Sequence, residues 1–254
     1  MDKNKYLERI QYKGQLETTI EVLEALQTHH LLHIPFENLD IHYGNPILLD
    51  TEKIYTKLIN HQRGGFCYEL NGLFFELLKH LGFDVIRISA RVFDSKNGNY
   101  GAEFDHMAIV ATINQEQYLV DVGFGEFTIK PLKLVLNEVQ HDPNGAFVIE
   151  KTEDGYYRVS KLNGDQKEFN YIFTTTPRAF TEFGGMCTYH QSNPASHFTQ
   201  KKVISKPTPN GRITLSDDYL KISENGKETT QLPFESEADF NRYLAEYFGI
   251  KGHQ

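Results

Sequence analysis

The strongest constraint on the fold is a change of hydrophobic period at Gly82. Before this glycine, apolar side chains recur at helical spacing in residues 16–29, 51–60 and 67–81, which is typical of amphipathic helices. After it, short runs rich in β-branched residues, beginning with residues 85–93, indicate strands. A chain that is helical first and β-rich afterwards is predicted to have an α+β fold.

The β-rich part divides into two groups of strands. The first group contains residues 85–93, a hairpin formed by residues 106–113 and 118–122, and strands between residues 147 and 175. Short strands joined by tight turns in this way are consistent with a barrel or a sandwich. The second group lies between residues 201 and 232, with turns at 207–211 and 225–226, and a closing helix follows from about Ser236. It predicts a smaller α/β unit.

Composition excludes several classes of protein. The chain has 254 residues, of which 39% are hydrophobic, enough for one large core or for two or three small units. Cys67 and Cys187 are the two cysteines, so we expect free thiols and a cytoplasmic location. No apolar run approaches the ~20 residues that span a bilayer. The formal net charge of −8, without a basic cluster, argues against nucleic acid as a partner.

The segment Arg63–Asn71 places a cysteine where chemistry is expected. Gly64 and Gly65 allow a sharp turn, and the helical pattern begins at once after them, so Cys67 is predicted at a helix N-terminus. Unpaired backbone N–H groups and the helix dipole at that position favour a thiolate. The alternative is a structural cysteine buried in the first turn of a core helix.

Two other polar groups in the helical part have a simpler interpretation. Ile34–Asn38 is an irregular segment in which Pro35 stops the preceding helix, and Glu37 is interpreted as a residue that caps neighbouring backbone. His29, His30 and His33 lack an acidic or cysteine partner at a useful spacing. We therefore expect no metal site.

His106 and Asp121 bracket the predicted hairpin. Their separation of 15 residues is odd, so an even-numbered loop directs both side chains to the same face. A turn centred on residues 113–114 would place them directly opposite each other, whereas a turn centred on 115–116 would leave them four residues out of register, roughly 13 Å along the strands. The sequence of the loop does not determine which of these two registers forms.

The hairpin is followed by Gly123-Phe124-Gly125. Its backbone can approach a ligand closely because glycine has no Cβ. A dinucleotide fingerprint would need a third glycine and a following helix, which are not seen here. Residues 176–200 are expected to form an irregular connection, and its Cys187, His190 and His197 are interpreted as structural.

Cysteine, histidine and aspartate thus occur in the order of a cysteine–histidine–acid triad. His106 would take the proton of Cys67, and Asp121 would hold the imidazole in the correct tautomer. The thiolate would then attack a carbonyl, with backbone N–H groups near Cys67 stabilising the oxyanion. A helical lobe that carries the cysteine and a β lobe that carries the histidine describe a papain-like architecture.

Four blocks of this sequence resemble the arylamine N-acetyltransferases. They are residues 34–38, residues 63–71, His106, and residues 120–125, where the acid is Asp121 as in the family pattern. The resemblance is specific from about residue 34 to about residue 130 and looser through residues 192–198 to the end of the chain. It implies an N-terminal helical bundle at residues 1–83, a central β-barrel at 84–190, and a C-terminal α/β lid at 191–254.

The resemblance also implies a ping-pong acetyl transfer. Cys67 would attack acetyl-CoA, and an arylamine or hydrazine would accept the acetyl group from the acetyl-cysteine. By similarity, four aromatic residues would line the acceptor pocket: Phe36, Tyr68, Phe124 and Phe198. Gly123, Gly125 and Thr128 would lie near the CoA entrance. Contacts to the CoA phosphates are not assigned, and the candidates are Lys130, Lys201, Lys202 and Arg212.

Two other functions are compatible with the same residues. A thiol hydrolase, either a peptidase or an amidase, would use the same triad and admit water to the acyl-enzyme. A binding protein or scaffold would keep the fold without an activated thiol. The sequence does not indicate the preferred acceptor or the oligomeric state.

Overall fold

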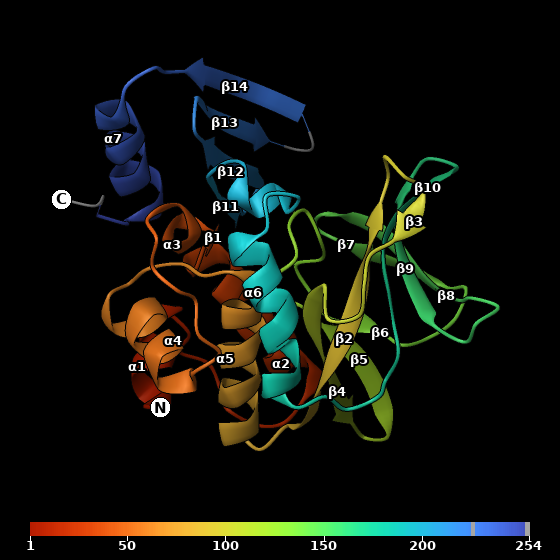
Figure 1. The fold of residues 1–254 in the computed structure, drawn as a ribbon. Helices are drawn as coiled ribbons and strands as arrows, with labels where there is room; N and C mark the ends of the chain where they lie inside the picture. Colours follow the sequence, from red (N-terminus) through yellow and green to blue (C-terminus); the bar gives the residue numbers. More distant parts are fainter. Residues whose placement is uncertain (225–226, 252–254) are drawn as a thin grey trace.

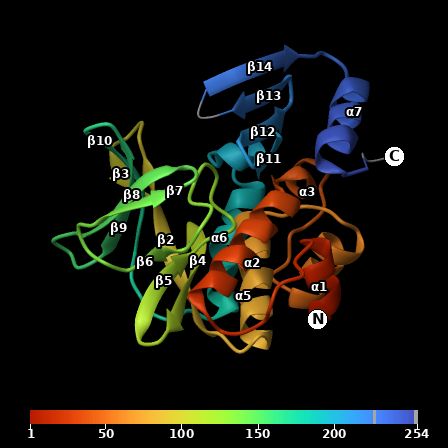
Figure 2. The ribbon, with the colours of Figure 1, turned by 180° about the vertical axis from the view of Figure 1, so that it is seen from behind.

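A computed structural model describes residues 1–224 and 227–251 of the chain. It contains a helical part, a long curled antiparallel sheet and a second, smaller antiparallel sheet (Figure 1). The curled sheet lies beside the helices, and the smaller sheet lies across one end of both (Figures 1 and 2). The predicted α+β class is confirmed.

The helical part begins with five helices, α1 to α5. They are α1 (Lys3–Arg9), α2 (Ile20–His33), α3 (Leu39–His42), α4 (Thr51–Tyr55) and α5 (Cys67–His80). α2 begins and ends four residues later than the sequence pattern indicates, because Thr19 caps its first turn and Pro35 follows its end. α4 continues into a π-helix at Thr56–Asn60. α5 packs on β4 and β2, and its Leu73 shares one buried core with Ile109 of β4 and Val120 of β5.

The curled sheet has the strand order β6-β5-β4-β2-β10-β9-β8-β7, with β3 paired to β2. Its strands are β2 (Asp84–Asp94), β3 (Asn99–Tyr100), β4 (His106–Ile113), β5 (Glu116–Val120), β6 (Leu132–Lys133), β7 (Val139–Asp142), β8 (Gly145–Lys151), β9 (Tyr157–Asn163) and β10 (Gln166–Phe173). Gln140 of β7 joins the two end strands. Its Oε1 accepts from the Lys133 N–H at 2.8 Å and its Nε2 donates to the Lys133 carbonyl at 2.9 Å. This side chain nearly closes the sheet into a barrel.

The smaller sheet has the order β1-β11-β12-β13-β14. Its strands are β1 (Phe36–Glu37), β11 (Val203–Thr208), β12 (Gly211–Ser216), β13 (Tyr219–Glu224) and β14 (Lys227–Pro233), and helix α7 (Glu237–Phe248) packs on it. α7 begins where the sequence pattern predicts, and Ser236 caps it by accepting from the Asp239 N–H at 3.1 Å. The predicted turn at 225–226 lies outside the described residues. β1 comes from the helical part, so the first strand of this sheet precedes the barrel in the sequence.

The connection at residues 176–200 is more regular than the sequence pattern indicates. It contains 3-10 turns at Phe180–Phe183 and His197–Thr199 and helix α6 at Gly184–Ser192. The prediction of an irregular segment was wrong here because glycine and proline lower helix propensity locally, whereas packing of Phe183 and Cys187 against Phe66 and Tyr68 stabilises the helix. The unit boundaries at 83/84 and 190/191 stay a prediction.

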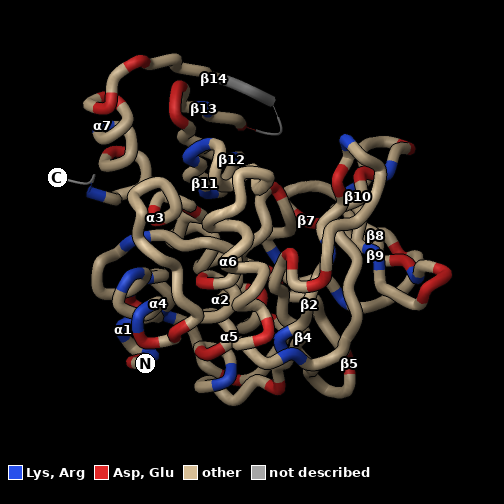
Figure 3. Tube along the Cα trace, viewed as in Figure 1, with Lys and Arg blue, Asp and Glu red and all other residues tan. Residues whose placement is uncertain are grey.

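Basic and acidic residues are both distributed over the helical part and the two sheets (Figure 3). Within the same residues, no helix has the length and apolar composition needed to cross a membrane.

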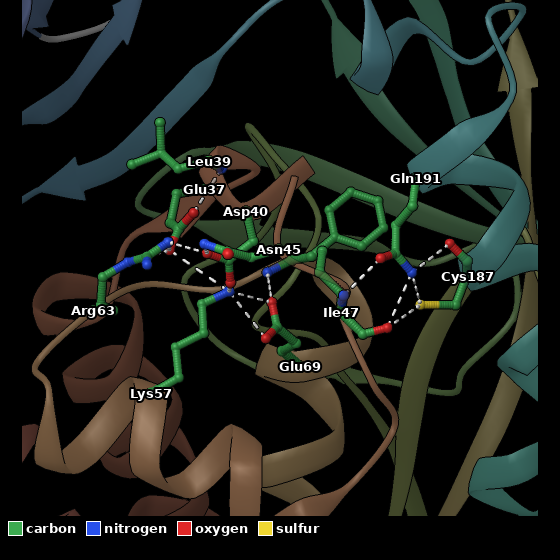
Figure 4. A network of polar contacts seen from close by, with 11 residues as sticks. Glu37, Leu39, Asp40, Asn45, Ile47, Lys57, Arg63, Glu69, Cys187 and Gln191 are labelled. Atoms are coloured by element: carbon green, nitrogen blue, oxygen red, sulfur yellow. Dashed lines mark hydrogen bonds and ion pairs between the residues drawn. The ribbon is translucent and has the colours of Figure 1, made fainter. Parts of the chain in front are cut away.

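A buried cluster of ion pairs connects the loop around β1 to the start of α5 (Figure 4). Lys57 Nζ lies 2.7 Å from Asp40 Oδ2 and 2.8 Å from Glu69 Oε2. Arg63 Nη2 lies 2.7 Å from Glu37 Oε1 and 3.0 Å from Asp40 Oδ1. Glu37 also accepts from a backbone N–H, which agrees with the capping role predicted for it. The cluster therefore fixes the chain before and after the turn at residues 64–65 that leads to Cys67.

We expect Lys57→Met to lower the free energy of unfolding by about 3–5 kcal/mol, because it leaves the buried Glu69 carboxylate without a cation, while Asp40 keeps its ion pair with Arg63. Urea unfolding followed by circular dichroism measures this loss. Lys133→Met, which removes an exposed ion pair with Glu116, is the matched control and is expected to cost at most about 1 kcal/mol. Equal losses in the two variants would contradict a structural role for the cluster.

Candidate active site

Cys67 is the first residue of α5, as the sequence pattern predicts. Phe66 precedes the helix in extended conformation, and its N–H donates to Glu69 Oε2 at 2.8 Å. The turn before it requires glycine, because a Cβ on Gly64 would lie 2.3 Å from the Pro35 carbonyl oxygen. The sharp entry into α5 thus follows from the close approach of two backbone segments.

The Cys67 thiol is buried, with an exposed fraction of 4%. Burial raises its pKa well above the ordinary range, and nearby Cys187 and Asp121 act in the same direction, although the Tyr68 N–H donates to the sulfur. The sequence led us to expect a lowered pKa from the helix N-terminus. Desolvation outweighs that effect here. An isolated thiolate is therefore unfavourable at this position, and ionisation requires a proton acceptor in direct reach.

His106 and Asp121 are brought together by the β4–β5 hairpin. Its ladder pairs Ile109 with Val120, and the loop is Asn114-Gln115, with positive φ at both residues. This register lies midway between the two considered from the sequence, so His106 and Asp121 are diagonal neighbours on one face. The parity prediction is confirmed: His106 Nε2 lies 2.7 Å from Asp121 Oδ2.

The Asp121 carboxylate is buried and fully hydrogen-bonded. Oδ2 accepts from His106 and from the Tyr171 hydroxyl, the latter at 3.0 Å. Oδ1 accepts from Asn71 Nδ2 at 2.8 Å and from the N–H groups of Gly123 and Phe124 at 2.9 and 3.1 Å. Burial raises the pKa of this carboxyl, but His106 and these donors outweigh burial and lower it overall. Asp121 therefore stays ionised.

Asn71 connects the cysteine helix to the acid. It lies four residues after Cys67, on the same helix face. Its Nδ2 also donates to the Met107 carbonyl at 2.7 Å, and its Oδ1 accepts from the Val122 N–H at 2.9 Å. This side chain thus holds α5 against both strands of the hairpin.

Cys67 and His106 open onto one cavity of about 420 Å³. Six of the residues predicted around the substrates line it as well, and they are Phe36, Gly123, Phe124, Gly125, Phe198 and Arg212. The other candidates for phosphate contacts, Lys130, Lys201 and Lys202, are not among its lining residues. Tyr68 and Thr128 are not among its lining residues. The Tyr68 ring is fully buried, and its hydroxyl donates to the carbonyls of Phe104 and Asp105. Thr128 is also buried, and its hydroxyl lacks a hydrogen-bond partner among the described residues.

Several residues around the site were not predicted from the sequence. His190 and His197, interpreted as structural, line the cavity, and His190 Nε2 lies 3.1 Å from Asp105 Oδ1. Tyr171 comes from β10, far from the motif blocks, and a tyrosine in a strand carries no signal of its role. Asn71, by contrast, lies in the block 63–71 that resembles the family and was expected to support the site from the helix start.

The histidines of α2 are not part of this site. His30 is fully buried against Tyr6, whose hydroxyl lies 2.8 Å from His30 Nδ1, and burial lowers the His30 pKa to about 3. In the described part of the chain, no group of three or more His, Cys, Asp or Glu side chains is arranged to hold a metal ion.

The two ring nitrogens of His106 have different roles. Nε2 is occupied by Asp121, so Nδ1 is the nitrogen left to accept a proton inside the cavity. A thiol, a base with a fixed tautomer and a buried acid in one pocket are the components of nucleophilic acyl chemistry.

Comparison with known proteins agrees with this chemistry. The family model described as N-acetyltransferase matches residues 19–253. The chain is 34% identical to a pineal gland arylamine N-acetyltransferase of Gallus gallus, over 91% of this chain and 87% of the relative.

Solved structures give the same result. The arylamine N-acetyltransferase of Salmonella typhimurium superposes with a TM-score of 0.93 at 26% identity, over 98% of this chain and 90% of that one. That of Mycobacterium marinum, solved in complex with CoA, has a TM-score of 0.90 at 31% identity, over 98% and 93%. The buried His106–Asp121 pair in one site with Cys67, the family match and these two folds lead to one conclusion: the chain belongs to the arylamine N-acetyltransferase family.

Proposed function

We propose that this enzyme transfers an acetyl group from acetyl-CoA, through an acetyl-Cys67 intermediate, to the nitrogen of an arylamine or arylhydrazine. The observation that carries the proposal is that Cys67 and His106 line one cavity while His106 is held by a buried, ionised Asp121. The relative solved with CoA supports acetyl-CoA as the donor.

In the first half-reaction, His106 Nδ1 takes the thiol proton as Cys67 Sγ attacks the thioester carbonyl carbon. The proton moves from sulfur to imidazole within the cavity. Because burial disfavours a lone thiolate, the Cys67 thiolate forms only as an ion pair with the His106 imidazolium. The N–H of Cys67, at the open start of α5, is available to the oxyanion. The tetrahedral intermediate then collapses, the C–S bond to CoA breaks, and CoA leaves with the proton from His106.

In the second half-reaction, the amine nitrogen attacks the acetyl carbon of the intermediate. His106 Nδ1 accepts the amine proton and returns it to the Cys67 sulfur as the thioester breaks. Phe36, Phe124 and Phe198 supply apolar walls to the cavity, which suits an aromatic acceptor that is neutral at pH 7.

Incubation with acetyl-CoA alone is expected to add one acetyl group to the protein in an intact-mass measurement. Addition of a hydrazine should remove it and yield the acetylhydrazine. Cys67→Ala is expected to form no adduct, whereas Cys187→Ala, which removes the other thiol, should still form it. An unmodified wild-type protein would reject acetyl transfer, and an adduct that water removes as fast as the hydrazine does would favour the thiol hydrolase.

We expect Asp121→Asn to lower kcat/KM by about three to four orders of magnitude, since an amide nitrogen facing His106 Nε2 selects the wrong tautomer. Stopped-flow measurement of acetyl-enzyme formation tests this, with circular dichroism to confirm the fold. Tyr171→Phe removes one donor to the same carboxylate oxygen and retains the acceptor for His106, so its loss should be far smaller. Substantial activity in Asp121→Asn would mean that another group orients His106.

Gly123→Ala is expected to slow acetyl-enzyme formation by about 100-fold through displacement of the nucleophile. The added Cβ would lie 2.7 Å from Asn71 Nδ2 and 2.9 Å from Cys67 Cα. Gly125→Ala, whose Cβ meets no atom within 4 Å, should lose far less in the same rate measurement. Similar rates in the two variants would show that the contact with Cys67 does not limit catalysis.

A further inference from the structure

One face of the β11–β12 hairpin forms a polar wall of the catalytic cavity. Ser205 pairs with Thr214 across the two strands, and Arg212 lies two residues before Thr214. Alternate residues of a strand share a face, and all three of these side chains line the cavity together with Cys67 and His106. Phe36, Phe124 and Phe198 supply apolar parts of the same lining, so this row is a distinct polar surface.

Within this wall, Arg212 is a cation without a counter-ion. Its Nη1 donates to Ser205 Oγ at 2.8 Å, and Ser205 Oγ lies 3.0 Å from Thr214 Oγ1. In residues 1–224 and 227–251, no carboxylate forms an ion pair with the guanidinium. A guanidinium has five N–H donors, and the hydrogen bond from Nη1 to Ser205 Oγ uses one of them.

An unpaired charge in this position is costly. Burial lowers the pKa of Arg212, and Glu126 is the acidic group that acts against this. Glu126 lines the same cavity from the loop after β5, where its φ is +52°. Since burial of a cation is unfavourable until an anion pairs with it, the wall is built to gain free energy when an oxyanion enters.

We propose that Arg212, supported by Ser205 and Thr214, is an oxyanion-binding subsite for a substrate that occupies the catalytic cavity. This inference rests on the proposed function and adds that one of the two substrates carries a negatively charged group that Arg212 binds. The shared chemistry is a phosphate or a carboxylate, which a guanidinium binds through two parallel N–H groups.

Two substrates supply such a group. The tip of the same hairpin, residues 208–211, lines a second cavity of about 720 Å³ together with Lys161 and Asn144. The first source is a phosphate of acetyl-CoA, whose thioester must enter the cavity that Arg212 lines together with Cys67. Alternatively, an arylamine with a carboxylate on its ring would place that carboxylate at Arg212 while its amine faces Cys67.

Two pairs of substrates distinguish the phosphate of CoA from the carboxylate of the arylamine, because the members of each pair differ in whether they carry that charged group. Acetyl-CoA is compared with S-acetylpantetheine, which lacks all phosphates, and 4-aminobenzoate is compared with neutral 4-aminobenzamide. For Arg212→Gln we expect the ratio of kcat/KM, charged to neutral, to fall about tenfold or more in one pair, the loss typical of a charge-assisted hydrogen bond. The affected pair identifies the phosphate or the carboxylate.

Further variants test whether the change in the kcat/KM ratio comes from the charge at position 212. Arg212→Lys keeps the charge and should lose less of the ratio than Arg212→Gln. Glu126→Gln removes a repelling charge and should raise the ratio in the same pair. Arg242→Gln, on the exposed face of α7 in an ion pair with Asp239, removes the same net charge far from the wall and should leave both ratios at the wild-type value.

Calorimetric titration of CoA and of 4-aminobenzoate into wild type and Arg212→Gln gives a readout that does not depend on catalysis. A loss of affinity of about tenfold or more for one of them in the variant supports the subsite even if acetyl transfer fails. Ratios and affinities that are unchanged in Arg212→Gln, or changed equally in Arg242→Gln, would overturn the proposal while leaving the proposed function in place.

Discussion

The carboxylate of Asp121 is the group on which the rest of the site depends. It draws donors from three parts of the chain, because Asn71 comes from α5, His106 from β4 and Tyr171 from β10, and two backbone N–H groups come from the loop that follows it. A buried charge is tolerated only when its lone pairs are filled. The same requirement that stabilises Asp121 therefore fixes the helix, the imidazole and the glycine loop relative to one another.

Much of this arrangement follows from local sequence. The helical pattern and the two glycines predict Cys67 at the start of α5, and parity alone predicts a shared face for His106 and Asp121. The register was not predictable, because Asn114-Gln115 lacks the glycine that marks a two-residue hairpin loop and both residues adopt positive φ without it. The resemblance to known acetyltransferases supplied the fold of the β-rich part, which the strand pattern left between barrel and sandwich.

What the sequence did not predict arises from contacts between distant segments. Tyr171 becomes important because the sheet topology brings β10 to the site, and it lies in no recognisable motif. Arg212 was one of four candidates for CoA phosphate contacts, and its place in the cavity with Cys67 follows from the topology that brings β12 there. Tyr68 was expected in the pocket wall from the resemblance to the family, but it lies one helical step of about 100° from Cys67 and its ring is buried in the core. The raised pKa of Cys67 likewise depends on burial, which only the packed structure defines.

The two-residue strand β1 has a consequence for how substrates enter. It lies in the helical part, between α2 and α3, yet it pairs with β11 through Phe36 and Glu37, and Glu37 is held by Arg63. The C-terminal sheet therefore cannot swing away as a rigid body unless backbone hydrogen bonds and a buried ion pair break together. Access to Cys67 then depends on motion of loops and side chains at a preformed opening. The shared strand β1 fixes the C-terminal sheet to the helical part at the place where a hinge would otherwise be expected.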